Sequence, residues 1–380
     1  MHEPFTSIPR IAYFSMEVAL RSEIPTYAGG LGVLAGDSVR SAADLALPLV
    51  TVTLVSRRGY FRQELDSEGR QTAEPEPWNP AEFATPLRAK VTVPIERREV
   101  WVGGWLYPLG SSTGEVQPVI LLDTDHPENT PEDRRITDCL YGDGPDLRLK
   151  QEIVLGIGGV RLLDALQFDI RQYHLNEGHS ALLTLELLRR FAYPQAELRE
   201  GEPAHDVPRV RKLCNFTTHT PVDAGHDRFP YSLVETVLGD IVDLDVVKRE
   251  GGGDVLNMTQ LALNLSEYIN GVAKRHAETS RKLYPGYHVR SVTNGVHPRT
   301  WTSPSFCKLY DEFLPGWSLE PELLVRADCC IPQAAIWQAH AESKRELIDV
   351  VKRATGVELD AALPILGFAR RMTAYKRPDL

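Results

Sequence analysis

Residues 11–55 read IAYFSMEVALRSEIPTYAGGLGVLAGDSVRSAADLALPLVTVTLV and contain the clearest signal of the fold. Ile11–Met16 and Leu49–Val55 are short apolar runs rich in aromatic and β-branched residues, so each predicts a buried strand. Gly30–Leu47 lies between them and predicts a helix that opens at a pair of glycines. A strand, a helix and a second strand in this order are typical of an α/β fold with a largely parallel sheet.

The same alternation continues along the chain. Further strands are predicted at Phe168–His174, Leu213–Thr218, Val289–Val296 and Leu363–Phe368. Further helices are predicted at Leu147–Leu166, Ser180–Phe191, Met258–Tyr284 and Gln333–Thr355. Aromatic and β-branched runs separated by turns predict an antiparallel insertion over Gly59–Asp123, and Pro298–Pro315 is interpreted as a hinge.

Composition excludes several classes of protein. The chain has 380 residues, enough for two or three domains, and a formal net charge of -10, which argues against nucleic-acid binding. It has no signal peptide pattern and no run of 18 apolar residues, so we expect a cytoplasmic protein with no membrane span. The five cysteines form no CxxC pair and HExxH spacing is absent, so we expect reduced, mostly buried thiols and no metal site.

The glycines at the start of the first helix are a candidate anion site. In Tyr27–Asp37, paired glycines let backbone N–H groups approach a ligand closely, and the helix dipole favours negative charge. The pattern is neither a Walker loop nor a GxGxxG fingerprint, so a tight strand-to-helix turn is the alternative. Glu17 follows the first strand, where its side chain could face a cleft.

Polar clusters follow three more predicted strands. They are His174–His179, Thr217–His226 and Thr293–His297, and open α/β sheets bind ligands at the carboxyl ends of their strands. For His174 and His226 we favour an ordinary packed histidine. Asn294–Gly295 is first of all a turn signal, but between two α/β halves it could also place an amide in a cleft.

A basic cluster follows the last predicted strand. Arg370, Arg371, Lys376 and Arg377 lie close together in an acidic chain, which favours a site for a small anion such as phosphate. The alternative is a solvated charged turn.

In this order, these motifs resemble the α-glucan phosphorylases, the glycogen, starch and maltodextrin phosphorylase family, and most closely its shorter bacterial branch. Further blocks that match are Leu147–Glu152, Asn257–Leu263 and Asn270–Val272. The resemblance implies a two-domain, Rossmann-like, type-B glycosyltransferase fold. Residues 1–295 would form a nearly complete N-terminal domain, and residues 296–380 the hinge and the first elements of the C-terminal cofactor domain.

The resemblance also implies a reaction. Inorganic phosphate would cleave the terminal bond of an α-1,4-glucan to give glucose 1-phosphate, with pyridoxal 5'-phosphate as cofactor. The partners would be the glucan and phosphate, with a homodimer in the intact family protein and no nucleic acid or membrane.

The resemblance also implies roles for individual residues of the site. Gly29 and Gly30 would turn backbone amides toward the cofactor and substrate phosphates, and His219 would lie beside the glucosyl ring. Asn294 would bind a glucosyl hydroxyl, and Glu17 would contact the substrate.

The terminal cluster takes the remaining roles. Arg371 and Lys376 would hold the phosphates in catalysis, Tyr375 would lie by the sugar, and Arg370 would lie near the cofactor phosphate.

One part of the family pattern is missing. The cofactor lysine of the family lies in a Gly- and Asn-rich block beyond the basic cluster, and no lysine here has that context. We therefore expect a truncated chain that is inactive by itself. A nucleotide-sugar glucosyltransferase of the glycogen or starch synthase type and a non-catalytic glucan-binding fragment are the alternatives.

Overall fold

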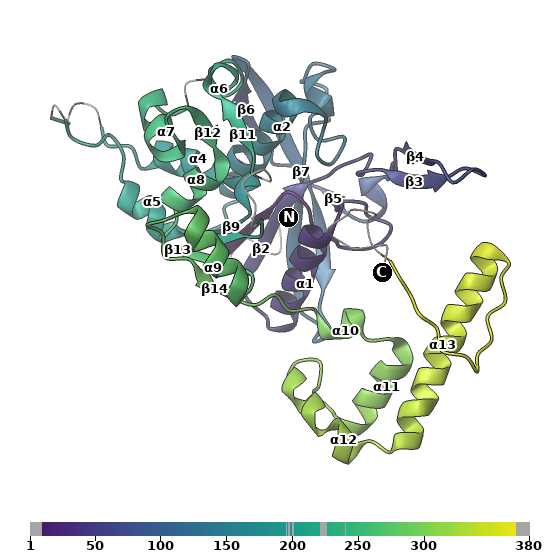
Figure 1. Ribbon diagram of the computed structural model, residues 1–380. Helices are drawn as coiled ribbons and strands as arrows, with labels where there is room; N and C mark the ends of the chain where they lie inside the picture. Colours follow the sequence, from purple (N-terminus) through teal and green to yellow (C-terminus); the bar gives the residue numbers. More distant parts are fainter. Residues whose placement is uncertain are drawn as a thin grey trace. The chain divides into compact units, whose positions relative to one another are not determined.

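The chain divides into two units, Met1–His297 and Pro298–Leu380 (Figure 1). The computed structural model describes residues 10–194, 196, 198–199, 201–220, 226–239 and 241–369. None of the helices in these ranges is both long and apolar enough to cross a membrane. The five cysteines are free thiols, but the expectation that most of them are buried is wrong, because Cys214 alone among the five is buried.

A ten-stranded sheet forms the centre of the first unit, in the order β14-β13-β10-β9-β1-β2-β8-β7-β5, with β6 paired to β7. Its parallel strands are β1 (Ile11–Ser15), β2 (Leu49–Leu54), β8 (Val116–Asp123), β9 (Gln172–Asn176), β10 (Cys214–Thr218), β13 (Tyr268–Gly271) and β14 (Arg290–Ser291). Strand β1 has β2 on one side and the much later β9 on the other. The strand order therefore reverses between β1 and β9, where sheets of this type bind ligands.

The antiparallel part extends from β8. It contains β5 (Thr85–Pro86), β6 (Val91–Ile95) and β7 (Arg98–Gly110), while β3 (Arg62–Leu65) and β4 (Gln71–Glu74) form a separate hairpin. Another small pair joins β11 (Arg228–Pro230) to β12 (Val255–Asn257). The predicted antiparallel insertion is confirmed, except that β8 pairs in parallel with β2 and so belongs to the main sheet.

Helices lie on both faces of this sheet. Helix α1 (Gly30–Asp44) packs on one face, where Ala35 and Val39 join Val119 and Leu121 of β8 in an apolar cluster. The larger core includes α2 (Gly144–Ile153), α3 (Gly159–Ala165), α4 (Leu183–Arg190), α5 (Val207–Leu213), α6 (Tyr231–Val237), α7 (Leu244–Gly251), α8 (Met258–Asn264) and α9 (Lys274–Leu283).

Two glycines allow α1 to pack closely on the chain that follows β1. A Cβ on Gly36 would lie 2.2 Å from the carbonyl oxygen of Ala19, and one on Gly32 would lie 2.7 Å from Glu17 Oε2. The Ala19 N–H in turn donates to the Gly32 carbonyl at 2.8 Å. The glycines of this helix therefore serve packing as well as the turn at its start.

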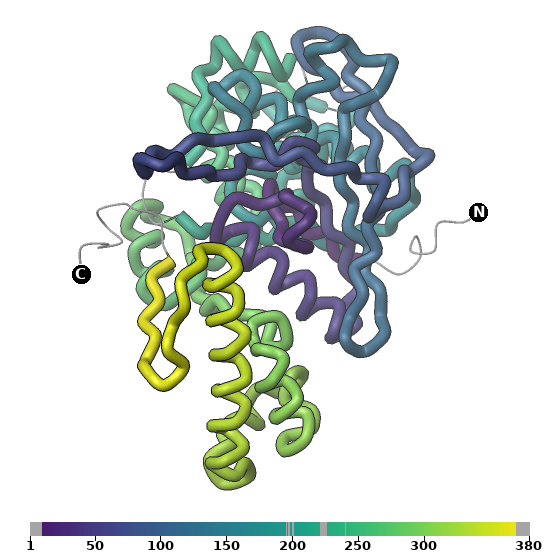
Figure 2. The backbone as a smooth tube through the Cα atoms, turned by 90° about the vertical axis from the view of Figure 1, so that its right-hand side faces the viewer, coloured from purple at the N-terminus to yellow at the C-terminus, as the bar shows by residue number. Residues whose placement is uncertain are grey.

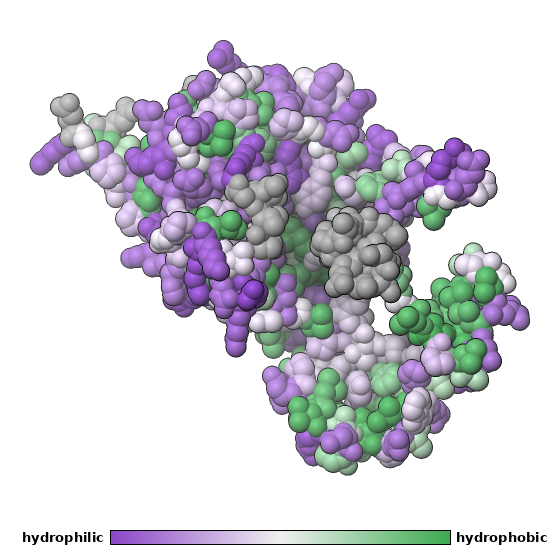
Figure 3. Space-filling view, viewed as in Figure 1, coloured by the Kyte–Doolittle hydropathy of each residue, from purple (hydrophilic) through white to green (hydrophobic). Residues whose placement is uncertain are grey.

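The second unit is helical. It contains α10 (Pro298–Trp301), α11 (Pro304–Phe313), α12 (Ala327–Cys330) and the long α13 (Gln333–Thr355), which lies beside α11 (Figure 2). Leu309, Leu314, Trp317 and Ile331 form its small core. Apolar residues also gather on the outer surface of this unit (Figure 3), among them Val325 and Trp337.

Several predicted elements are confirmed. Strands β1, β2 and β10 and helices α1 and α13 lie within three residues of their predicted bounds. The long helix predicted over Leu147–Leu166 is α2 and α3 joined by a π-helical turn at Val154–Gly158. The strand predicted at Phe168–His174 begins only at Gln172, and the one predicted at Val289–Val296 is reduced to β14.

Two predictions are wrong. Met258–Tyr284 is α8, strand β13 and α9, because β13 pairs with the distant β10 and local periodicity does not show such pairing. Leu363–Phe368 forms no strand: Leu366 is 100% exposed, and the described part of the second unit contains no strand for this segment to pair with. Pro298–Pro315, interpreted as a hinge, begins at the boundary between the two units and is largely helical.

Candidate functional site

Three polar side chains meet where the strand order reverses. Asn176 at the end of β9 donates from Nδ2 to Ser15 Oγ of β1 at 2.9 Å. Its Oδ1 accepts from His219 Nε2, just past β10, at 2.6 Å. The carboxyl ends of three neighbouring parallel strands are thus joined side chain to side chain.

His219 is a neutral imidazole in this arrangement. Burial lowers its pKa to about 3, and the ring donates through Nε2, which leaves Nδ1 without a proton. A half-buried neutral histidine suits contact with an uncharged ligand such as a sugar. Burial likewise lowers the pKa of His174 to about 4, and Thr217 accepts its Nε2–H at 2.8 Å, so the prediction of a packed histidine there agrees with the structure.

Glu177 holds the chain at His219 in place. Its buried Oε2 accepts from the backbone N–H of His219 at 2.8 Å, and from the N–H and hydroxyl of Thr220, each at 3.1 Å. Its own backbone has φ 68° and ψ 174°, a conformation that non-glycine residues rarely adopt. The sequence analysis missed this role, although an acid between Asn176 and Gly178 at a strand end is a usable signal.

Asn294 lies on the same groove as His219. This groove of about 470 Å³ runs along one sheet face beside α1, and its lining includes Ser38, His174, Asn176, Thr217, His219, Asn270 and Asn294. The lining combines apolar surface with neutral donors and acceptors. Such a surface can bind the C–H faces and hydroxyls of a carbohydrate.

The glycine turn lies outside the lining of that groove. Glu17 Oε2 accepts from the backbone N–H of Ala28 at 2.7 Å and of Gly29 at 3.1 Å, and Oε1 accepts from Tyr141 at 2.6 Å. The Gly29 amide is therefore already bonded within the protein. Gly30 begins the 15-residue α1, and apart from its chain neighbours and the backbone of its own helix, no atom of the described residues lies within 4 Å of the position of a Cβ on it. This open helix N-terminus is the part of the described site that suits an anion.

A buried charged network extends from Tyr141. Arg148 lies over the Tyr141 ring at 4.3 Å and bonds Asp227 Oδ2 through Nη2 at 3.0 Å. Its Nε lies 3.2 Å from Oε1 of Glu152, a side chain with no exposed surface. Burial, and then the Asp227 carboxylate, raise the pKa of Glu152 well above its ordinary value. Sequence reasoning found only the block containing Arg148 and Glu152, because their partners lie far away along the chain.

The chain is similar to curated phosphorylases over almost its whole length. The maltodextrin phosphorylase of Thermococcus litoralis is 37% identical over an alignment of 405 positions, which covers 97% of this chain and 48% of that protein. Glycogen phosphorylases of Mycobacterium tuberculosis and Aquifex aeolicus are 34% and 32% identical over 97% of this chain, and it covers 48% and 58% of them. No protein-family model matches.

These matches support the assignment of the chain to the α-glucan phosphorylase family. The chain spans about half the length of these curated relatives. The mixed α/β unit built on a largely parallel sheet agrees with the predicted fold class.

Part of the set of site residues that the family resemblance implies lies within the described residues. Glu17, Gly29, Gly30, His219 and Asn294 are all at the carboxyl edge of the sheet or on the groove. Arg370, Arg371, Tyr375 and Lys376 lie outside the described residues. Within the described ranges, no cluster of three or more His, Cys, Asp or Glu side chains could hold a metal ion.

Proposed function

We propose that this chain binds the non-reducing end of an α-1,4-glucan for phosphorolysis to glucose 1-phosphate. The observation that carries the proposal is the shared groove of His219 and Asn294, which offers neutral hydrogen-bonding groups beside apolar surface. The names of the relatives support glucan as the substrate class.

The proposed division of labour follows from charge. A glucosyl unit is neutral, so the neutral His219 and the Asn294 amide suit it and cost little to bury. Phosphate is anionic, and the N-terminus of α1 at Gly30 offers it backbone N–H groups and a favourable dipole. We assign Arg371 and Lys376 to the same phosphate, because the amides of one helix end do not balance a dianion.

Pyridoxal 5'-phosphate is the cofactor that we propose for the protein. The open space around the Gly30 backbone suits a phosphate group, which Gly30 and Arg370 would hold. When bound, this cofactor supplies a phosphate that passes a proton to the substrate phosphate. Around it, Glu17 would keep the glycine turn rigid, and Glu177 would keep His219 against the sugar.

Binding by the 380-residue chain tests the first half of the proposal. We expect saturable calorimetric binding of maltoheptaose and a loss of at least about fivefold in affinity for Asn294→Ala, since one hydrogen bond to the sugar is worth about 1 kcal/mol or more. Asn79→Ala is the matched control, because Asn79 caps a short helix elsewhere. Absence of maltoheptaose binding, or binding of ADP-glucose in its place, would refute the proposal.

The reaction is tested on the protein purified from its source organism. We expect formation of glucose 1-phosphate from maltoheptaose that requires inorganic phosphate. Glucosyl transfer from a sugar nucleotide without phosphate would instead establish the synthase alternative.

A further inference from the structure

Two exposed aromatic rings lie on the loop that follows β2. Tyr60 is 41% exposed and Phe61 is half-buried, and their ring centroids are 4.2 Å apart with the planes tilted by 36°. Single exposed aromatic residues are common on protein surfaces. A pair of rings in contact with each other presents a larger apolar area, and here the chain around it is held firmly.

The loop that carries this pair is fixed by hydrogen bonds on several sides. The Gly59 N–H donates to the Ser56 carbonyl at 2.8 Å, and Leu140 N–H donates to the Gly59 carbonyl at 2.9 Å. Trp78 Nε1 donates to the Ser56 carbonyl at 3.0 Å.

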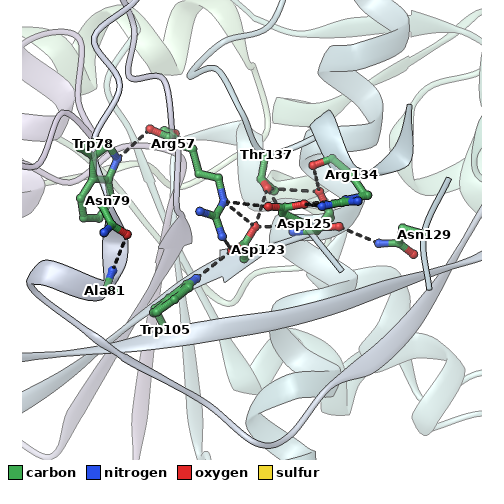
Figure 4. Close-up of polar contacts among 12 residues, drawn as sticks. Arg57, Trp78, Asn79, Ala81, Trp105, Asp123, Asp125, Asn129, Arg134 and Thr137 are labelled. Carbon is green, nitrogen blue, oxygen red and sulfur yellow. Dashed lines mark hydrogen bonds and ion pairs between the residues drawn. The ribbon is translucent and has the colours of Figure 1, made fainter. Parts of the chain in front are cut away.

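Arg57, which follows Ser56 in the loop, is bonded to the end of β8. Arg57 bonds both oxygens of the buried Asp123, and Trp105 Nε1 donates to the same carboxylate at 2.7 Å (Figure 4). A ligand that contacts Tyr60 therefore meets a surface whose backbone is already ordered, so little conformational entropy is lost on binding.

A chain of contacts connects the aromatic pair to the candidate site. The Tyr60 ring stands edge-on to the Tyr141 ring at a centroid distance of 6.3 Å. Tyr141 donates to Glu17 Oε1 at 2.6 Å, and Glu17 Oε2 accepts from the Gly29 N–H. The pair thus lies next to the glycine turn, at the carboxyl ends of β1 and β2.

We propose that Tyr60 and Phe61 form a binding subsite for glucosyl units of an α-1,4-glucan other than the unit that reacts. This inference rests on the proposed function and adds to it the place where the rest of the glucan binds. A pyranose ring has an apolar C–H face that covers an aromatic ring, while its hydroxyls stay at the edge for water or polar side chains. The exposed polar strands of the β3–β4 hairpin, which begins at Arg62, lie directly beyond the pair.

The subsite makes glucan affinity depend on chain length. A short oligosaccharide that fills only the groove at His219 and Asn294 does not need the aromatic pair, whereas a longer one reaches it. The experiment is calorimetric titration of the 380-residue chain with maltotriose and with maltoheptaose.

Tyr60→Ala is expected to weaken maltoheptaose binding about five- to tenfold and to leave maltotriose binding unchanged. Tyr60→Phe should keep the affinity, since the ring face remains. Tyr193→Ala is the matched control, because Tyr193 is 45% exposed in a different loop. This variant should bind both sugars as the wild type does. Far-UV circular dichroism checks that each variant is folded.

The outcomes separate this inference from the proposed function. If the wild type binds no maltoheptaose, the proposed function fails. If the wild type binds it and Tyr60→Ala binds it equally well, or loses maltotriose to the same extent, the proposed function stands and the subsite is refuted. If Tyr60→Ala does not fold, a loss of maltoheptaose affinity in Phe61→Ala supports the subsite and an unchanged affinity refutes it.

Discussion

Replacing Glu152 with Gln is expected to change how the stability of the first unit depends on pH. Glu152 has no exposed surface, and although Arg148 Nε lies 3.2 Å from its Oε1, neither carboxyl oxygen has hydrogen-bond geometry with a described residue. Burial and the nearby Asp227 outweigh Arg148 and raise the pKa of Glu152 well above 4.5, so folding favours the protonated form. Gln has nearly the same shape and carries no charge at any pH.

The sign and size of the effect follow from linkage. A carboxyl group whose pKa is raised on folding contributes stability that is fully present below about pH 4.5 and is lost as the pH rises through the folded-state pKa. The loss is at most about 1.4 kcal/mol for each pH unit in that window. Glu152→Gln avoids it, so the variant should gain on the wild type by up to about 3 kcal/mol between pH 5 and pH 7.

The assay is urea unfolding of both proteins from pH 5 to pH 8, with hydrogen exchange of β9 amides to report on the first unit. Glu186→Gln is the matched control, because Glu186 is also fully buried but is paired with Arg161 at 2.9 Å and Arg189 at 2.6 Å. Burial raises the pKa of Glu186, but its arginine partners outweigh this and lower it.

Glu186→Gln should therefore cost about 1–3 kcal/mol near neutral pH, because its arginine partners are partly exposed and water screens them, and its deficit should shrink as the pH falls below about 4.5. Parallel pH profiles for wild type and Glu152→Gln would show that Glu152 is ionised in the folded protein and would refute the reasoning.

Three other outcomes test the site and its supports. Gly30→Ala should keep the wild-type free energy of unfolding within about 1 kcal/mol yet weaken phosphate binding. Gly32→Ala should lose about 2 kcal/mol or more of unfolding free energy in urea titration, because its Cβ would lie 2.6 Å from Tyr27. Equal losses for the two variants would contradict this. His297→Ala should lower the urea midpoint by removing the 2.9 Å bond to the buried Asp44, at a cost of about 2 kcal/mol, and an unchanged midpoint would argue against that bond. Glu177→Ala should weaken maltoheptaose binding as strongly as His219→Ala does, and titration of both variants would show a difference if Glu177 did not position the histidine.

Local patterns in the sequence were sufficient for much of the fold. The strand, glycine turn and helix at residues 11–44 are visible because apolar runs, glycines and helical periodicity all act within a few residues of one another. The same reasoning failed at Tyr268–Gly271. This strand is defined by parallel pairing with β10, about fifty residues earlier. The helices on either side of it, α8 and α9, have helical periodicity, and this led to the prediction of one helix over the whole segment.

The site shows the same division between local and distant information. His219 and Asn294 could be proposed because each lies in a recognisable block, yet the groove that they share depends on how β10 and the chain after β14 come together. Glu177 could not be assigned from its neighbours. Its importance lies in three hydrogen bonds to residues more than forty positions away, and in a backbone strain that only the folded structure shows.

The electrostatics of the described site explain why the terminal basic cluster matters to the proposal. The histidines near the groove have lowered pKa values and are neutral, and Arg57 and Arg148 are already bonded to Asp123 and Asp227. One helix N-terminus supplies about half a positive charge, which is less than a phosphate dianion requires. If the protein uses inorganic phosphate, the balancing cations have to come from residues beyond this set. The segment Arg370–Arg377 contains four basic residues in eight positions of an acidic chain, so we propose this segment as a source of that charge.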